Sequence, residues 1–277
     1  MTTTLRPAGP LQQADDGTKS RTYDVCVNSR RVGTIDIGTD PGFGPAVGLL
    51  GSLRIDEPDR RRGRGTVAAL AAEEVLRGWG CDQVLASAPP GAAAARRMLA
   101  SLGYTERSRN MVKELPGEPP ALPAGVEGRP MNEAEFARWR ADSVENYARS
   151  WTDRGARPEE ARAKSVASHR ENLPDGLATP GVAMWVLVEG ATVLGHVWVS
   201  HREGRERTSY VYDVRVGEAH RGRGFGRALM LLAERLCAEA GSARLGLHVF
   251  ADNAPAVGLY VSLGYTTTSG HFYKKLL

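Results

Sequence analysis

The 277-residue sequence has no long apolar run, and no segment approaches the ~18 uninterrupted apolar residues that a membrane-spanning helix needs. Its first residues, Met-Thr-Thr-Thr-Leu-Arg-Pro, lack the apolar stretch of a secretory signal. Cysteine is scarce: Cys26, Cys81 and Cys237 are far apart, odd in number and without the spacing of a metal site. We therefore expect a cytoplasmic protein with neither a disulfide framework nor a metal centre.

A strong charge of one sign is also lacking. The 36 Lys and Arg residues and 32 Asp and Glu residues leave a net charge of +4, which does not demand a nucleic-acid partner but suits an anionic ligand such as a nucleotide-bearing cofactor. Apolar residues make up 42% and charged residues 25% of the chain, as is normal for a globular protein. The length allows one large domain or two ordinary ones.

A glycine-rich loop stands out in the second half of the chain. Residues 209–216, Ser-Tyr-Val-Tyr-Asp-Val-Arg-Val, predict a strand, and leucines at three- and four-residue steps after residue 226 predict a helix. The loop between them is Arg221-Gly222-Arg223-Gly224-Phe225-Gly226. A strand, a glycine turn and a helix in this order direct backbone N–H groups at an anion, usually a phosphate. The Lys-Ser/Thr pair of a P-loop is missing, so the loop alone also fits a basic turn without a ligand.

The two halves of the sequence repeat with a constant offset of 161 residues. The offset superimposes Arg60 on Arg221, Gly63 on Gly224 and Gly65 on Gly226, and the match continues without a gap to residues 115 and 276. Such a duplication predicts two similar domains. We expect a mobile tail at 1–20, a first domain at 21–115, a proline-rich linker at 116–126 and a second domain at 127–277. Two predicted helices, within residues 132–173, occur only in the second.

A second motif carries a family resemblance. The segment Asn253-x-x-Ala-x-x-Leu-Tyr260-x-x-Leu-Gly-Tyr265, together with the Arg-x-x-Gly-x-Gly loop, resembles the signature of the GNAT N-acetyltransferases over about residues 184–277, and the first half matches more weakly. The resemblance implies an α/β (α+β) fold with two GNAT-like domains, each a twisted mixed β-sheet flanked by helices. The strand before the loop is expected to splay from the next strand. A fused pair with one degenerate half is similar to the mycothiol synthase branch of this family.

The resemblance implies that the protein binds acetyl-CoA and moves its acetyl group to a primary amine of a small molecule or a peptide. In the second half the implied cofactor-binding residues are Val214, Val216, Arg221, Gly222, Arg223, Gly224, Phe225, Gly226 and Asn253, and in the first half they are Arg60, Gly63 and Gly65. Residues of the extra helices that are candidates to line the acceptor pocket are Glu145, Tyr147, Trp151 and Glu171.

Acetyl transfer to an amine needs a proton acceptor and a proton donor. An alkylamine has a pKa near ~10.4 and is mostly protonated at neutral pH, and the departing thiolate benefits from a donor. By resemblance Tyr260 is the donor, although its spacing alone fits a core aromatic. Asp213 is the candidate base, because desolvation in an otherwise apolar strand raises a carboxyl pKa. An aspartate on the solvent face of the strand is the alternative that the sequence leaves open.

The first half lacks these reacting groups. Under the same offset Ser52, Ala92 and Leu99 stand where the second half has Asp213, Asn253 and Tyr260. We therefore place catalysis in the second domain and expect the first to be a packing partner with or without a silent acetyl-CoA site. One alternative is a protein that senses acetyl-CoA without turnover. The other is that the arginine-rich loops bind nucleic acid, and this reading is disfavoured because the arginine runs occupy one loop in each repeat. The expected partner is the amine substrate, with no nucleic acid, no membrane and a monomer that acts as an intramolecular pseudo-dimer.

Overall fold

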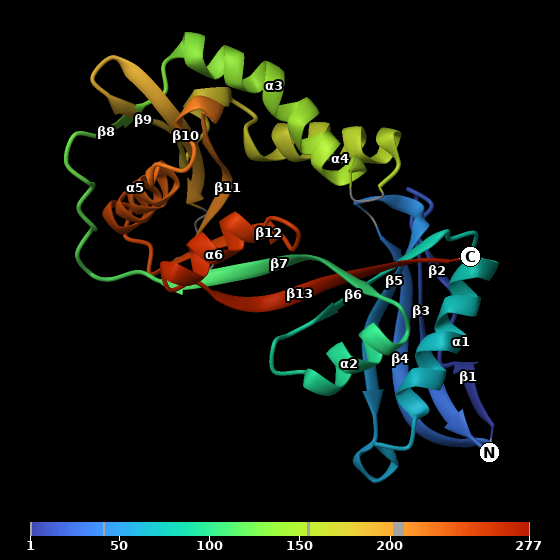
Figure 1. Ribbon diagram of the computed structural model, residues 1–277. Helices are drawn as coiled ribbons and strands as arrows, with labels where there is room; N and C mark the ends of the chain where they lie inside the picture. Colours follow the sequence, from blue (N-terminus) through green and yellow to red (C-terminus); the bar gives the residue numbers. More distant parts are fainter. Residues whose placement is uncertain (1, 41, 154–155, 202–207, 277) are drawn as a thin grey trace. The chain divides into compact units, whose positions relative to one another are not determined.

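The computed structural model describes residues 2–40, 42–153, 156–201 and 208–276. The chain forms two compact units: unit 1 is Met1–Ser108 with Ser269–Leu277, and unit 2 is Arg109–Thr268. Figure 1 colours the chain from blue to red, so the dark red C-terminal segment of unit 1 stands out among its blue strands. None of the described helices combines the length and the apolar character that crossing a membrane requires.

Unit 1 is a mixed sheet with two helices. The strands of its sheet are, in order, β1 (Thr3–Pro7), β3 (Lys19–Val27), β4 (Arg30–Asp40), β5 (Gly44–Ile55), β6 (Gln83–Ala88) and the end of β13 (Thr266–Lys275), with β2 (Gln12–Gln13) paired to β3. The β5–β6 pair is parallel and the other pairs are antiparallel. The helical elements are η1 (Glu57–Asp59), α1 (Arg64–Gly78) and α2 (Ala93–Ser101). Ala68, Ala72 and Leu76, one turn apart on α1, are fully buried in its core.

The prediction of a mobile tail at residues 1–20 is wrong. Thr3–Pro7 forms β1, which pairs antiparallel with β3 from Thr3↔Val27 to Pro7↔Tyr23. Leu5 packs against the core of unit 1, so one apolar side chain and a backbone ladder are enough to order a polar segment. β1 pairs with β3 as β8 (Glu127–Pro130) pairs with β9 (Val182–Glu189), and it is therefore the counterpart of β8 in unit 1.

Unit 2 repeats this sheet and adds two helices. Its strands are, in order, β8, β9, β10 (Thr192–His201), β11 (Thr208–Val216), β12 (Arg244–Phe250) and the end of β7 (Thr105–Glu114). The β11–β12 pair is parallel, and β8 to β11 are antiparallel neighbours. The helical elements are α3 (Glu133–Thr152), α4 (Pro158–Asn172), η2 (Gly176–Ala178), η3 (Glu218–His220), α5 (Phe225–Glu239) and α6 (Ala254–Ser262). The two predicted helices within residues 132–173 are α3 and α4.

Alternation along the strands separates two cores in unit 2. Val197 and Val199 of β10 pack with α5, whereas Trp198 between them packs with Trp139 of α3. Helices α3 and α5 therefore cover opposite faces of this sheet, as period-two strands require. Helix α3 begins at a capping box, in which Asn132 accepts from the backbone of Glu135 and the Glu135 carboxylate accepts from the backbone of Asn132.

The predicted linker is part of unit 2. Within residues 116–126, Leu122 packs against the core and Val126 is buried. The Arg235 guanidinium of α5 donates to the Pro120 carbonyl at 3.2 Å. The boundaries therefore differ from the predicted 115/127 division, because prolines stiffen this segment and its two apolar side chains attach it to α5.

The two repeats exchange their last strands. The 161-residue offset makes β7 the counterpart of β13 and β6 the counterpart of β12. However, β13 pairs with β6 in unit 1, from Gly270↔Ala88 to Lys275↔Gln83, and β7 lies next to β12 in unit 2. Each unit therefore contains the last strand of the other repeat.

A buried glutamate in each unit binds a lysine from the exchanged strand. In unit 2 both carboxylate oxygens of Glu234 lie 2.8 Å from Lys113 Nζ, and Glu234 is 1% exposed. In unit 1 the equivalent Glu73 binds Lys274 at 2.7 Å and accepts from the Tyr104 hydroxyl at 3.0 Å. Burial raises the pKa of Tyr104, and the Glu73 charge acts in the same direction, so this hydroxyl stays protonated and donates. The glutamate thus selects a cation that arrives from the other repeat.

We predict that Lys113→Met destabilises unit 2 by about 3–5 kcal/mol, because it leaves a buried carboxylate without its cation. Urea unfolding followed by tryptophan fluorescence reports mainly on unit 2, where four of the five tryptophans lie: Trp139, Trp151, Trp185 and Trp198. The exposed Lys275→Met is the matched control and should leave the midpoint unchanged.

Glu234→Gln added to Lys113→Met should recover part of the loss, because it removes the unpaired charge. A Lys113→Met protein with the wild-type midpoint would show that the ion pair does not hold the exchanged strand.

Candidate active site

The ladder between β11 and β12 ends early. Parallel pairs run from Thr208↔Arg244 to Val211↔Leu247, although β11 continues to Val216 and β12 to Phe250. Among the described residues, β11 therefore has no strand partner on its β12 side over residues 212–216. The predicted splay is confirmed, and it places the backbone of Val214 and Val216 along an opening between two strands. Backbone groups at such an edge need hydrogen-bond partners from outside the sheet.

The glycine loop follows β11 directly and ends at the N-terminus of α5. Gly222 and Gly224 have φ values of 76° and 85°, a left-handed conformation that glycine adopts without strain. Gly224 is the N-cap of α5 and offers no capping side chain, so the first N–H groups of the helix face outward. Arg221 and Arg223 are more than half exposed, and Arg223 lies 4.9 Å from the Phe225 ring centroid. The loop therefore has the N–H groups and the charge that an anion needs.

Tyr260 lies on α6 in the core of unit 2, 6% exposed, with its ring centroid 5.9 Å from that of Tyr265. Burial and the negative charge of Asp213 raise the pKa of Tyr260 to about 12. Its hydroxyl is therefore protonated at neutral pH and can donate a proton or a hydrogen bond.

Asn253 is the N-cap of α6. Its Oδ1 accepts from the Ala256 backbone N–H at 3.3 Å. Its role in holding a cofactor stays a prediction, whereas its capping role explains why an asparagine begins this helix.

Asp213 is held by two donors from other elements. Its Oδ2 accepts from Trp139 Nε1 of α3 at 2.9 Å and lies 2.9 Å from His196 Nε2 of β10. The Asp213 side chain is 34% exposed and that of His196 is 20% exposed, so the pair reaches solvent. Because Nε2–H of His196 donates to the carboxylate, its Nδ1 keeps the lone pair in the neutral imidazole.

The expected rise of the Asp213 pKa is wrong. Burial does raise it, but the His196 hydrogen bond and charge, the Trp139 hydrogen bond and the charge of Arg215 outweigh burial. The pKa of Asp213 is therefore lowered and the carboxylate is ionised at neutral pH. The strand alone suggested an apolar setting, and the two donors that reverse the direction come from α3 and β10.

Aromatic rings surround this pair. The Trp139 ring centroid lies 5.5 Å from Trp198 and 6.5 Å from His196, both edge-to-face, and Tyr212 stacks on Trp198 at 4.7 Å. Sequence reasoning did not select Trp139. The signal was the Phe136-x-x-Trp139 spacing on α3, which places two large aromatics on one helix face toward the sheet.

The four acceptor-pocket candidates on the extra helices separate into two groups. Tyr147 and Trp151 pack edge-to-face at 6.1 Å, and Trp151 stacks on His248 at 6.0 Å, so both are part of an aromatic cluster between α3 and the sheet. Glu145 forms an exposed ion pair with Arg162, and Glu171 is exposed.

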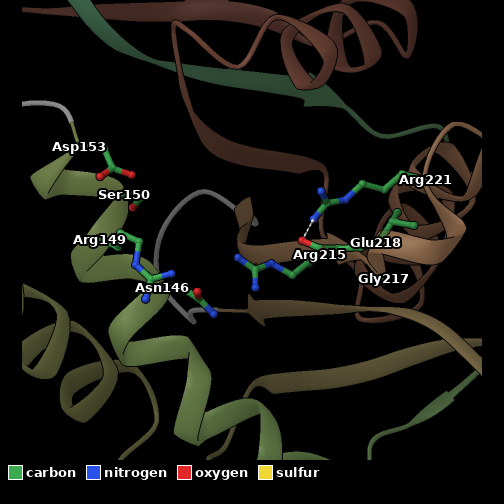
Figure 2. A pocket seen from close by; sticks show the side chains of 9 residues that line it. Asn146, Arg149, Ser150, Asp153, Arg215, Gly217, Glu218 and Arg221 are labelled. Atoms are coloured by element: carbon green, nitrogen blue, oxygen red, sulfur yellow. Dashed lines mark ion pairs between the residues drawn. The ribbon is translucent and has the colours of Figure 1, made fainter.

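A pocket of about 480 Å³ lies between α3 and the end of β11 (Figure 2). Its lining residues are Asn146, Arg149 and Ser150 of α3, the C-cap residue Asp153, and Arg215, Val216, Gly217, Glu218 and Arg221 of β11 and the loop. It joins the open edge of β11 to the first arginine of the glycine loop.

Unit 1 keeps the backbone of this site. The β5–β6 ladder runs only from Val47↔Gln83 to Leu50↔Ala86, although β5 continues to Ile55. Arg61 and Gly63, the counterparts of Gly222 and Gly224, have φ values of 57° and 72°.

The side chains around the unit 1 loop differ. Asp59, the counterpart of His220, is buried and forms ion pairs with Arg30 and Arg64. Arg60 donates through Nε to the Ile55 carbonyl at 2.8 Å. In unit 1 a buried carboxylate therefore pairs with one arginine of the loop region, Arg64, and with Arg30 of β4. Leu99, at the Tyr260 position, is a buried apolar residue.

The family described as "Acetyltransferase (GNAT) family" matches residues 4–104 and 140–265 of the chain. A protein described as an uncharacterized N-acetyltransferase of Bacillus subtilis is 29% identical over 150 residues, 53% of this chain and 96% of its own length. A mycothiol acetyltransferase of Corynebacterium efficiens is 28% identical over 278 residues, 93% of this chain and 81% of its own length.

Two solved structures share the fold. A GCN5-related N-acetyltransferase from Sphaerobacter thermophilus superimposes with a TM-score of 0.59 at 17% identity over 92% of this chain and 80% of its own. A tandem GNAT protein from the clavulanic acid biosynthesis pathway superimposes with a TM-score of 0.51 at 18% identity over 95% of this chain and 85% of its own.

Proposed function

Because the chain belongs to the GNAT acetyltransferase family and is an acyltransferase, we propose that it moves an acetyl group from acetyl-CoA to a primary amine of a small molecule or a peptide. We assign the reaction to unit 2. One observation carries this assignment: the open strand edge and the glycine loop occur in both units, but the ionised Asp213 and the protonated Tyr260 accompany them in unit 2, where unit 1 has Ser52 and Leu99.

The residues of unit 2 fit acetyl-CoA. The open backbone edge at Val214 and Val216 supplies hydrogen-bonding groups for the amide-containing pantetheine arm. The loop from Arg221 to Gly226 supplies outward N–H groups and cationic side chains for the pyrophosphate. Asn253 lies at the start of α6 and is proposed to contact the arm. When bound, acetyl-CoA supplies the thioester that the amine attacks.

Two proton movements complete the proposal. Tyr260 donates to the departing thiolate, since its hydroxyl is protonated at neutral pH. The amine proton passes to the Asp213–His196 pair. Because Asp213 has a lowered pKa, it is a poor proton acceptor itself, whereas the neutral imidazole of His196 keeps a lone pair on Nδ1. We therefore propose that His196 accepts the proton and that Asp213 fixes its tautomer and stabilises the imidazolium.

We predict that the two glycine loops differ in acetyl-CoA binding. Arg221→Glu should weaken binding about tenfold or more, because it replaces a cation at the pyrophosphate loop with an anion. The matched Arg60→Glu should leave the affinity of the unit 2 site for acetyl-CoA unchanged. Calorimetry on the full-length protein measures the affinity and the number of sites.

A weaker second site that disappears in Arg60→Glu would show that the unit 1 loop still binds the cofactor at Arg60, Gly63 and Gly65 despite Asp59. Equal loss in both variants would contradict the assignment of the reaction to unit 2.

We predict that Tyr260→Phe lowers kcat by roughly 10²–10⁴-fold, the usual cost of losing a positioned proton donor. The affinity for acetyl-CoA should change little, because one hydroxyl is removed and the ring remains. Thiol release with an amine panel gives the rate, calorimetry gives the affinity, and thermal unfolding shows that the fold is intact. Full activity in Tyr260→Phe would make Tyr260 a packing residue.

We predict that Asp213→Asn lowers kcat/KM by roughly 10²-fold or more at every pH from about 6 to 9, because an amide cannot stabilise an imidazolium as a carboxylate does. The pKa of Asp213 is lowered, so its own protonation falls below this range and should not shape the profile. His196→Gln should show a similar loss. Trp139→Phe is the matched control: it removes the other bond to Oδ2 and should cost less than about tenfold. A His196→Gln enzyme with the wild-type rate would exclude the imidazole as the proton acceptor.

A further inference from the structure

Four polar residues form one face of α3 toward the pocket of unit 2. Asn146, Arg149, Ser150 and Asp153 follow each other at spacings of three, one and three residues, which places them on one side of the helix. Trp139 lies two turns before Asn146 on the same side of the helix and contacts Asp213 of β11, so this side of α3 faces the sheet. Toward the end of the helix the same side carries polar residues, and there it lines the cavity.

Two arginines in this pocket, Arg149 and Arg215, form no direct ion pair among the described residues. Figure 2 shows the guanidinium groups of Arg149, from α3, and Arg215, from β11, extending into the same space. Neither guanidinium forms a hydrogen bond or an ion pair with another residue in the described part of the chain, whereas Arg221 at the rim lies 3.5 Å from Glu218. Two unpaired guanidinium groups repel each other, and an anion between them removes the repulsion.

We propose that Arg149 and Arg215 bind an anionic group, a phosphate or a carboxylate, that a substrate carries into this pocket. Asn146 adds a side-chain amide beside them. The planar, multidentate guanidinium suits both kinds of group, because two parallel N–H donors match two oxygens. Asp153 and Glu218 also line the pocket, so three arginines face two carboxylates there and the site keeps a net positive charge.

The pocket adjoins the proposed pyrophosphate site, shares Arg221 with it and adds residues that the glycine loop does not contain. Residues 221–226 bind through backbone N–H groups at the helix start, whereas Arg149 belongs to a helix that the first repeat does not have. Under the 161-residue offset Arg215 corresponds to Arg54, which is also exposed, but unit 1 joins β1 to β3 without helices. Arg54 therefore has no partner equivalent to Arg149, and it provides a matched control within the same protein.

Two substrates can supply the anion: acetyl-CoA through its phosphates, or the acceptor amine through an acidic group. The test compares the full-length wild type with Arg149→Gln, Arg215→Gln and the control Arg54→Gln. Calorimetry measures binding of CoA, 3′-dephospho-CoA and inorganic pyrophosphate. Initial rates with acetyl-CoA measure KM for ethanolamine against its phosphate ester and for dipeptides with a free against an amidated C-terminus.

We expect Arg149→Gln and Arg215→Gln each to weaken the anion-dependent interaction about ten- to hundredfold and Arg54→Gln to change nothing. If the anion is the 3′-phosphate, the two variants lose the preference for CoA over 3′-dephospho-CoA. If it is the pyrophosphate, they bind both cofactors and inorganic pyrophosphate more weakly. If the acceptor carries it, cofactor binding stays intact and KM rises only for the phosphorylated amine or the free carboxylate.

Unchanged values for every ligand in Arg149→Gln and Arg215→Gln would overturn the inference. The kinetic arm rests on the proposed acetyl transfer, whereas the calorimetric arm does not need turnover. Loss of pyrophosphate binding in the variants of a protein that acetylates no amine would support the anion site and count against the proposed reaction.

Discussion

The arrangement of the site depends on the early end of one parallel ladder, the ladder between β11 and β12. After Val211↔Leu247 the backbone of β11 leaves β12 and must find hydrogen-bond partners outside the sheet. The glycine loop starts where this open edge ends, so an extended ligand with amides and a phosphate meets strand edge and helix start in succession. The same ladder ends equally early at Leu50↔Ala86 in the first repeat. The opening is thus a property of the backbone, and it is also present in the repeat whose side chains differ at the proposed reacting positions.

The strand exchange explains why a repeat without these side chains is still needed. The sheet of unit 2 is completed by the end of β7, which belongs to the first repeat, and β7 lies next to β12, the strand that forms one side of the opening. Lys113 from this strand neutralises Glu234, which is buried on α5 directly behind the sheet. The first repeat therefore contributes structure to the unit that we propose to be catalytic, whether or not its own loop binds a ligand.

The sequence predicted the repeat, the two helices within residues 132–173, the strand at 209–216 and the glycine loop, because each depends on local periodicity or on a constant offset. It could not predict the exchange, because Lys113 and Lys274 are equivalent under the offset and either could pair with either glutamate. It missed β1 because Thr3–Pro7 is mostly polar and is ordered by a ladder with distant residues. It gave the wrong direction for the Asp213 pKa because both donors, Trp139 and His196, come from other elements. Long-range contacts account for all three differences.

The α3–α4 insertion accounts for much of the difference between the two repeats. It lies between β8 and β9, where unit 1 joins β1 to β3 without helices. Trp139 of α3 donates to Asp213, and Arg149 of α3 faces Arg215, so the insertion supplies a partner to two charged residues of β11. In the first repeat the equivalent strand, β5, carries Ser52 and Arg54, and no helix inserted between β1 and β3 supplies such partners. A carboxylate at residue 52 would lack the tryptophan that helps to hold its charge. A unit without the insertion therefore lacks both the helices that we propose to line the acceptor pocket and a support for the proposed proton-transfer pair.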